Sequence, residues 1–313
     1  MRGRSRARTR TTTTATERNI VAYLSARRAE IDSELERLVP PGSRWPETLH
    51  RAVRHSLFAG GKRLRPILCL AAAEALGASA QDVLAPACGL ELLHTYSLVH
   101  DDLPAMDDAP LRRGAPTSHV VFGEATAILA GDALLTLGLA VLARHPEGRR
   151  YAAVKLQVLD VVTQAIGSEG MIGGQVSDLE AEREGLRSPE ILFSIHDAKT
   201  GRLIRASATA GGLYAFASDD VLARLDAYGR ALGLAFQIKD DLLDVESDAA
   251  TLGKRSGSDS EAQKLTFPAV WGLDRSREIL AEKTEEAIAE ARALPAGGGR
   301  LVDLARFVQQ RRS

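Results

Sequence analysis

Apolar residues recur every three or four positions along most of the chain, which is the spacing of one face of an α-helix. The first such series begins near Thr16, passes through Ile20, Leu24 and Leu35, and stops at the Pro-Pro-Gly stretch at 40–42. Residues that favour helices, namely Ala, Leu, Glu and Arg, dominate, and alternating β-branched residues are scarce. The pattern therefore predicts an all-α protein.

The same spacing predicts a succession of further helices. Ser188 before Pro189 and Glu190 is a typical helix start, with a capping side chain followed by a proline and an acid in the first turn. The stretch 125–141 is apolar on most faces, which is typical of a helix surrounded by others inside a bundle. No apolar run reaches the roughly 20 residues that cross a bilayer. The expected helices cover 45–59, 66–77, 81–103, 117–143, 148–176, 189–215, 219–246, 262–293 and 299–311.

No linker long enough to separate two domains interrupts these helices. We therefore expect one helical-bundle domain over residues 16–313, preceded by a disordered Arg/Thr-rich tail at 1–15. The 313 residues carry 40 Lys and Arg against 41 Asp and Glu, and this net charge of −1 argues against general nucleic-acid binding. Five Arg lie within the first ten residues, so the rest of the chain carries −6 and is mildly acidic.

Two cysteines, Cys69 and Cys88, lie in apolar surroundings. Two are too few for a disulfide framework or a zinc site. We expect both to be buried, reduced thiols, as in a cytoplasmic protein.

The acids gather first at 100–108, HDDLPAMDD, directly after the apolar run 90–99. Four carboxylates within eight residues repel one another beside a core unless cations neutralise them, and oxygen ligands suit Mg²⁺ or Mn²⁺ rather than zinc. On a straight helix Asp101 and Asp107 would lie about 240° apart. Because Pro104 cannot continue a regular helix, a local bulge could bring both to one site. A solvated, acidic helix end is the alternative.

A second acidic stretch lies at 237–244, QIKDDLLD. Asp240 and Asp244 are four residues apart and share a helix face, with Asp241 next to it. Taken alone, this is an ordinary charged face. Two such clusters that each close an apolar helix rarely arise by chance, and facing one another they would form a cage for several divalent ions. A diphosphate would complete that cage.

Cationic groups that could hold such an anion occur in several places along the chain. The stretch GGKRLRP at 60–66 combines glycines, which allow close backbone approach, with cations that hold phosphate oxygens. The stretch LRRG at 111–114 either pairs with the neighbouring acids or binds phosphate. Further cations are supplied by KTG at 199–201 and by Lys254 and Lys264.

Two polar residues interrupt apolar helical runs. His94 precedes Asp101 by two helical turns and therefore shares its face. A histidine so placed is more often structural, but here it points toward the acidic cluster. Gln175, in GGQVSD at 173–178, could likewise line a cavity.

Together these motifs resemble the trans-prenyl diphosphate synthases, in particular the short-chain farnesyl and geranylgeranyl group. The resemblance extends from Leu24 to the C-terminus, with the motifs above in the family order. It implies a helical bundle of the isoprenoid-synthase type around a deep central cavity, and a homodimer. It also implies a prenyltransferase that condenses allylic diphosphates with isopentenyl diphosphate. Many members carry acids where this chain has Ala109 and Pro110.

The resemblance also assigns roles to individual residues. It implies three Mg²⁺ ions (Mn²⁺ being possible) held by Asp101, Asp102, Asp107, Asp240, Asp241 and Asp244. It places the allylic diphosphate on Arg112, Lys199, Thr200, Gln237 and Lys254. It places isopentenyl diphosphate on Gly61, Lys62, Arg65, His94 and Arg113. The residues expected to be catalytic are Asp101, Asp102, Asp107, Lys199 and Asp240.

Product length depends on residues one turn deeper than the first aspartate. Ser97 and Tyr96 precede Asp101 by four and five residues. In relatives, an aromatic residue at the fifth position combined with this spacing of Asp101 and Asp107 stops growth at C15. We therefore favour farnesyl diphosphate, with geranylgeranyl diphosphate (C20) as the alternative, because 107–112 resembles bacterial carotenoid-pathway enzymes.

Two other functional classes share this architecture. A terpene cyclase would lack the isopentenyl diphosphate pocket, and Lys62, Arg65 and Arg113 argue against it. A non-catalytic regulatory subunit usually lacks one aspartate motif, whereas both are intact here.

Overall fold

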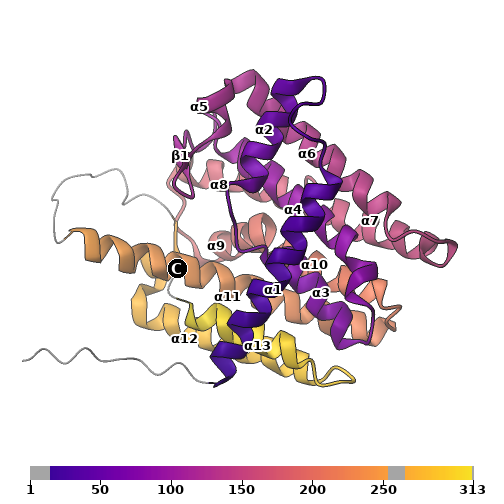
Figure 1. The fold of residues 1–313 in the computed structure, drawn as a ribbon. Helices are drawn as coiled ribbons and strands as arrows, with labels where there is room; N and C mark the ends of the chain where they lie inside the picture. The colour runs from indigo at the N-terminus through magenta and orange to yellow at the C-terminus, as the bar shows by residue number, and fades with distance from the viewer. Residues whose placement is uncertain (1–14, 253–264, 312–313) are drawn as a thin grey trace, which may run out of the picture.

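The computed structural model describes residues 15–252 and 265–311, and within these ranges the chain is helical except for loops and one hairpin of two-residue strands (Figure 1). The helices are α1 (Ala15–Leu38), α2 (Glu47–Phe58), α3 (Leu64–Ala75), α4 (Ala80–Asp101), α5 (Ser118–Phe122), α6 (Glu124–Arg144), η1 (Arg149–Tyr151), α7 (Ala152–Ile166), α8 (Met171–Glu184), α9 (Pro189–His196), η2 (Asp197–Gly201), α10 (Arg202–Tyr214), α11 (Asp219–Leu252), α12 (Phe267–Arg292) and α13 (Gly299–Gln310). The strands are β1 (Leu111–Arg112) and β2 (Ala115–Pro116), which pair antiparallel. The prediction of an all-α protein is confirmed.

Two predicted helices are wrong in continuity, and a third contains an irregular turn. Residues 117–143 divide into α5 and α6 at Gly123, whose φ of 83° is outside the helical region. Residues 148–176 divide into η1, α7 and α8. Residues 189–215 stay continuous but contain one π-helical turn, η2. The predicted start at Ser188 is confirmed, because its side chain accepts a hydrogen bond from the Ile191 N–H.

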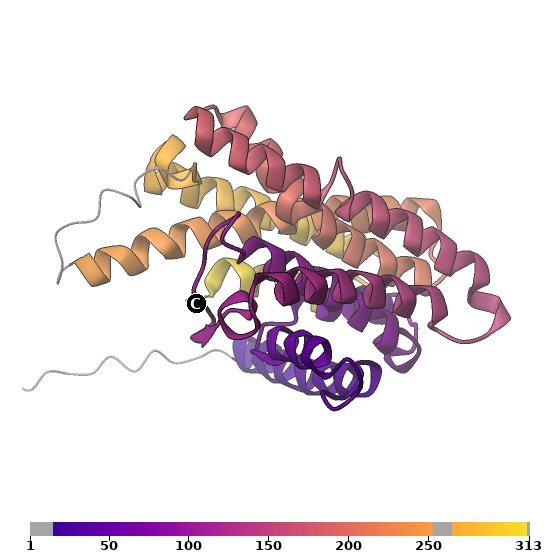
Figure 2. The ribbon, with the colours of Figure 1, turned by 90° about the horizontal axis from the view of Figure 1, so that it is seen from above.

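One buried apolar cluster connects the whole described chain, from Ile20 in α1 to Val308 in α13. At its centre α4 packs against α3 and α6, and α10 packs against α3 and α11. Seen from above, α11 and α12 lie side by side along one flank (Figure 2). A single continuous core supports the single-domain prediction, while residues 1–14 of the expected tail lie outside the described part.

The expectation that the apolar stretch 125–141 is enclosed on all faces is wrong. In α6, Ile128 and Leu129 are 44% and 58% exposed. The prediction that no apolar run could span a bilayer also needs correction, since α6 passes that test by length and composition. This helix packs against α4, α2 and α7, so the same residues serve as a partly covered wall of the bundle.

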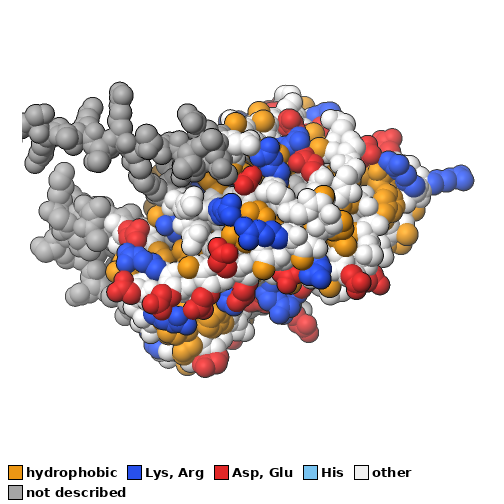
Figure 3. Space-filling model, turned by 90° about the horizontal axis from the view of Figure 1, so that it is seen from below, with side chains coloured by type: hydrophobic (Ala, Val, Ile, Leu, Met, Phe, Trp, Pro, Cys, Tyr) orange, Lys and Arg blue, Asp and Glu red, His pale blue; other side chains and the backbone are white. Residues whose placement is uncertain are grey.

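The thiols and the charges follow the sequence-based predictions. Cys69 and Cys88 are buried and unpaired. On the face that carries α12, acidic and basic side chains are interspersed (Figure 3), with Arg275 pairing Glu278 and Glu282.

Candidate active site

The first acidic stretch folds back on itself where α4 ends. The backbone N–H of Asp107 donates to the carbonyl of Asp101 (2.9 Å), and that of Asp108 donates to the carbonyl of Leu103 (3.1 Å). These bonds replace the helical pattern that Pro104 interrupts. The predicted bulge is therefore confirmed, and it brings Asp107 next to Asp101 despite their separation on an ideal helix.

The two adjacent acids of this stretch have different surroundings. Asp102 is 5% exposed, and its Oδ1 accepts hydrogen bonds from Nε (2.8 Å) and Nη2 (2.7 Å) of Arg112. Asp101 instead lines a cavity. Burial raises the pKa of Asp101 to about 6, with Asp107 adding repulsion and the charge of Lys199 opposing the rise. A half-buried carboxylate with a raised pKa gains from any cation that neutralises it.

The second acidic stretch repeats this division on α11. Asp241 is 5% exposed and accepts from Nε2 of Gln237 (3.0 Å) and from the backbone N–H of Phe267 (2.9 Å). Asp240 pairs with Nη2 of Arg311 (2.7 Å), and burial raises its pKa. Asp244 follows one turn later on the same helix. In each motif the second acid is thus held by the protein itself.

Carboxylates from both stretches could serve as ligands for a hard cation, although they do not converge into a preformed site. Among the described residues, no group of three or more His, Cys, Asp or Glu side chains is arranged to hold a metal ion. The donors are all oxygens, and the raised pKa of Asp101 shows that its negative charge is incompletely compensated. This donor set fits Mg²⁺ bound together with an anionic substrate that supplies further oxygens.

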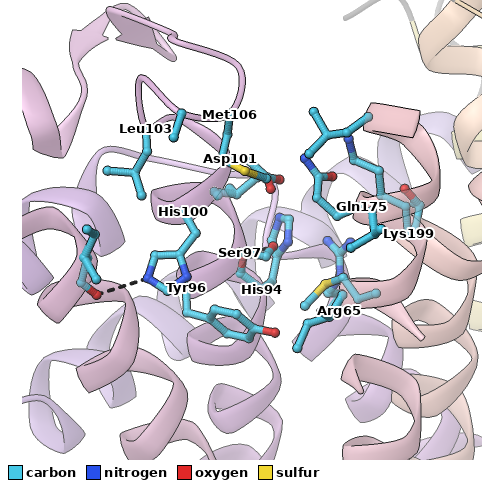
Figure 4. A pocket seen from close by; sticks show the side chains of 18 residues that line it. Arg65, His94, Tyr96, Ser97, His100, Asp101, Leu103, Met106, Gln175 and Lys199 are labelled. Carbon is cyan, nitrogen blue, oxygen red and sulfur yellow. Dashed lines mark hydrogen bonds between the residues drawn. The ribbon is translucent and has the colours of Figure 1, made fainter. Parts of the chain in front are cut away.

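An apolar cavity of about 490 Å³ begins at Asp101 and extends between α4, α6 and α8. In Figure 4, Asp101 lies at one end and Tyr96 at the other, with His100 and Ser97 between them. Gln175 lies on the opposite wall, and neither its amide oxygen nor its amide nitrogen has a protein partner. The prediction that Gln175 lines a cavity is confirmed.

Lys199 and Thr200 reach this cavity from the π-helical turn η2. Such turns often occur at functional sites, because the extra residue redirects side chains. Nζ of Lys199 donates to Asp178 (2.7 Å), and Oγ1 of Thr200 donates to Oε1 of Gln237 (3.1 Å). A Cβ on Gly174 would lie 2.4 Å from the backbone nitrogen of Lys199, so the glycine permits the close approach of α8 to η2.

A second, cationic cavity of about 390 Å³ adjoins the first. The predicted isopentenyl diphosphate residues all line it, namely Gly61, Lys62, Arg65, His94 and Arg113. Burial lowers the pKa of Arg65 to about 10, and burial together with Arg311 lowers the pKa of Lys62. Arg65 and His94 line both cavities, so the two spaces share a wall.

Comparisons with known proteins agree with this geometry. The polyprenyl synthetase family model matches residues 46–295. The chain belongs to the polyprenyl synthetase family. It is 43% identical to a dimethylallyltranstransferase of Fischerella ambigua, over 93% of this chain and 83% of that protein. It is 40% identical to a geranylgeranyl diphosphate synthase of Cyanophora paradoxa (95% and 98%) and 41% identical to a farnesyl diphosphate synthase of Bacillus subtilis (86% and 90%).

The fold of this family member is likewise shared with solved structures. A crystal structure of a FPP/GFPP synthase from Zymomonas mobilis aligns with a TM-score of 0.83 at 32% identity, covering 93% of this chain and 99% of that one. The polyprenyl synthetase described here is therefore a short-chain trans-prenyltransferase with an all-α fold. Relatives of both farnesyl and geranylgeranyl specificity are equally similar.

Three groups of polar contacts in this polyprenyl synthetase were not predicted from the sequence. Arg63, inside GGKRLRP, lies at the wall of the cationic cavity, but its guanidinium is bound by Asp32, Glu91 and the Leu57 carbonyl. The other two are the Asp178–Lys199 pair and the Arg311–Asp240 pair. These contacts join residues that are distant in sequence. Only Arg311 has a local sequence signal, because it belongs to the basic pair at 311–312. Lys254 and Lys264 lie outside the described residues.

Proposed function

We propose that this prenyltransferase condenses dimethylallyl and geranyl diphosphate with isopentenyl diphosphate and releases farnesyl diphosphate. The observation that carries the proposal is the shared wall of the two cavities. The apolar one fits an isoprenoid tail, the cationic one fits a second diphosphate, and Arg65 and His94 separate them. Two substrates held on either side of such a wall can react where their cavities meet.

The allylic substrate is assigned to the apolar cavity. Its diphosphate would lie at the Asp101 end, where Asp101, Asp107, Asp240 and Asp244 would hold up to three Mg²⁺. When bound, Mg²⁺ supplies charge neutralisation that favours departure of the diphosphate from the allylic carbon. Lys199 would add a cation on the same side, because its charge already acts on Asp101 and Asp107.

Isopentenyl diphosphate is assigned to the cationic cavity. Lys62, Arg65 and Arg113 are held close together there, and burial disfavours their charges until an anion pairs with them. His94 stays neutral, since burial and Arg65 hold its pKa well below the ordinary value. Ser97 lines the apolar cavity, but its hydroxyl donates to the His94 backbone carbonyl (2.9 Å), and carbocation chemistry requires no protein nucleophile.

Farnesyl diphosphate is proposed as the main product because Tyr96 limits the depth of the apolar cavity. The Tyr96 side chain is buried, at 4% exposed, at the end opposite Asp101. Geranylgeranyl diphosphate is the alternative, supported by relatives of that specificity. We also propose that Arg112 and Gln237 contribute indirectly, because they orient Asp102 and Asp241. The proposed enzyme is a cytoplasmic homodimer.

The test is incubation of purified protein with Mg²⁺, dimethylallyl diphosphate and isopentenyl diphosphate, followed by dephosphorylation and chromatography of the alcohols. We expect mainly the C15 alcohol, and mainly C20 would overturn the product assignment. Asp101→Asn and Asp240→Asn should each lower turnover at least a hundredfold while the helical circular dichroism signal persists. A hydrocarbon formed from farnesyl diphosphate alone would indicate a terpene cyclase instead.

A further inference from the structure

His100 lies between the metal-facing Asp101 and the cavity-ending Tyr96, and nothing above assigns it a function. Its ring lines the apolar cavity and faces Tyr96 edge-on, with the ring centroids 5.9 Å apart and the planes at 77°. The two residues are four positions apart on α4, so they are stacked on one helix face. Any movement of the His100 ring therefore reaches Tyr96 directly.

Helix α6 holds His100 in this position. Nε2 of His100 donates a hydrogen bond to the backbone carbonyl of Ile128 (3.0 Å), shown as the dashed line in Figure 4. Because a carbonyl only accepts, this bond requires the proton on Nε2. The ring is thus anchored to the facing helix, where Oδ1 of Asp132 also lies 3.9 Å from Nε2.

Gly131 makes room for the ring on α6. A Cβ at this position would lie 2.1 Å from Nε2 and 2.4 Å from Cδ2 of His100. Those distances are far inside van der Waals contact, and backbone strain plays no part because α6 is regular there. Any side chain at position 131 would consequently displace the ring from α6 toward the cavity.

Tyr96 has no polar anchor of its own. Its hydroxyl oxygen is buried and has no hydrogen-bond partner in the protein. Its place at the end of the cavity is therefore set by packing alone, and His100 is the aromatic neighbour on its cavity-lining face. A side chain held only by packing moves when its neighbour is removed.

We propose that His100, seated on Gly131 and anchored to the Ile128 carbonyl, is a specificity-determining residue that sets product length by holding Tyr96. This inference rests on the proposed prenyl transfer and deepens it. His100 acts as a positioning residue for the cavity end and takes no part in bond making. Gly131 of α6 therefore contributes to product length through its contact with His100, in addition to Tyr96 and Ser97 of α4.

The test compares product chain lengths from dimethylallyl and isopentenyl diphosphate. His100→Ala should raise the ratio of C20 to C15 product at least tenfold, because the cavity gains the volume of the ring and Tyr96 loses its support. His100→Gln, whose amide nitrogen can take the place of Nε2 and still donate to the Ile128 carbonyl, should give an intermediate ratio and serves if the alanine variant folds poorly. Gly131→Ala should act in the opposite direction, with C10 accumulating and the KM for geranyl diphosphate rising.

The double variant His100→Ala/Gly131→Ala should behave like His100→Ala, because the clash no longer has a partner. Gly138→Ala is the matched control: its Cβ would lie 2.8 Å from Cγ of Leu93 on the same helix pair, but neither residue lines the cavity. It should lower stability and leave the product ratio unchanged. Equal product ratios in wild type and His100→Ala, or the same shift in Gly138→Ala, would overturn the inference. No prenyl product from the wild type would instead reject the proposed function.

Discussion

Nη2 of Arg311, just past the end of the last helix, lies 2.7 Å from Oδ1 of Asp240 in the middle of α11. The same nitrogen donates to the Phe236 carbonyl (2.9 Å), and the guanidinium lies over the Phe236 ring at 4.1 Å. The Arg311 side chain is 3% exposed, whereas that of Asp240 is 38% exposed and stays accessible to a cation. The C-terminus of the chain is thereby attached to the second aspartate motif.

This pairing makes Arg311 a competitor of Mg²⁺ at Asp240. Arg311→Ala is expected to lower the Mg²⁺ concentration for half-maximal turnover by about tenfold, because a hydrogen bond to a charged group contributes about 1.5 kcal/mol or more and about 1.4 kcal/mol corresponds to a factor of ten. The measurement is initial rate against Mg²⁺ at saturating substrates. Arg306→Ala, within α13, is the control and should leave the requirement unchanged. A raised requirement in Arg311→Ala would show that the arginine assists metal binding.

Arg63 stabilises the fold through a buried ion pair. Its Nη1 lies 2.9 Å from Glu91, and both side chains are 2% exposed. Arg63→Met leaves Glu91 buried without its partner and should lower the free energy of unfolding by about 3–5 kcal/mol. Urea unfolding measures this loss, and Glu91→Leu in the same background should restore part of it. Arg275→Met, which removes an exposed pair, should cost far less; equal losses in the two variants would contradict the interpretation.

The raised pKa of Asp101 predicts an unusual pH dependence of the stability of the metal-free protein. Burial raises its pKa from 3.8 to about 6, so the folded state holds the proton more tightly than the unfolded state does. Its contribution to stability is therefore complete below pH 3.8 and is lost as the pH rises through 6. Asp101→Asn has no such loss and should be more stable than wild type at pH 7.5 by up to about 3 kcal/mol, since one pKa unit equals about 1.4 kcal/mol.

Chemical unfolding with a chelator present, at pH 4.5 and at pH 7.5, measures this difference between Asp101→Asn and wild type. The advantage of the variant should shrink toward the lower pH. An advantage that is the same at both values would mean that the Asp101 charge is not the cause.

Asp240 and Asp241 are adjacent but should respond differently to the same substitution. Asp241 accepts the backbone N–H of Phe267, the first residue of α12, so Asp241→Asn weakens the attachment of that helix. Loss of this buried bond should lower the free energy of unfolding by about 1–3 kcal/mol. Asp240→Asn keeps an oxygen that can accept from Arg311, so it should cost less stability than Asp241→Asn while turnover is lost. Thermal unfolding of both variants, combined with their rates, distinguishes the roles, and equal destabilisation would contradict them.

The assignment of metal ligands shows where sequence reasoning stops. All six aspartates were expected to bind Mg²⁺ alike, because the motif names them together. In the structure Asp102 pairs with Arg112, Asp240 with Arg311, and Asp241 accepts the Phe267 N–H, while Asp101 lines the apolar cavity. Helical periodicity cannot predict this division, since it depends on partners 10 and 26 residues away.

Most of the helices, the family and the residue types at the site can be predicted from the sequence, because local spacing specifies a helix face and the motifs keep their order. The bulge at Pro104 was one of two alternatives that follow from the missing backbone donor of proline. The tertiary structure was needed to show that Arg63 binds within the protein, that the two cavities share Arg65 and His94, and that His100 lies on Gly131. Each of these depends on how closely two helices approach, and that distance is set by packing across the whole core.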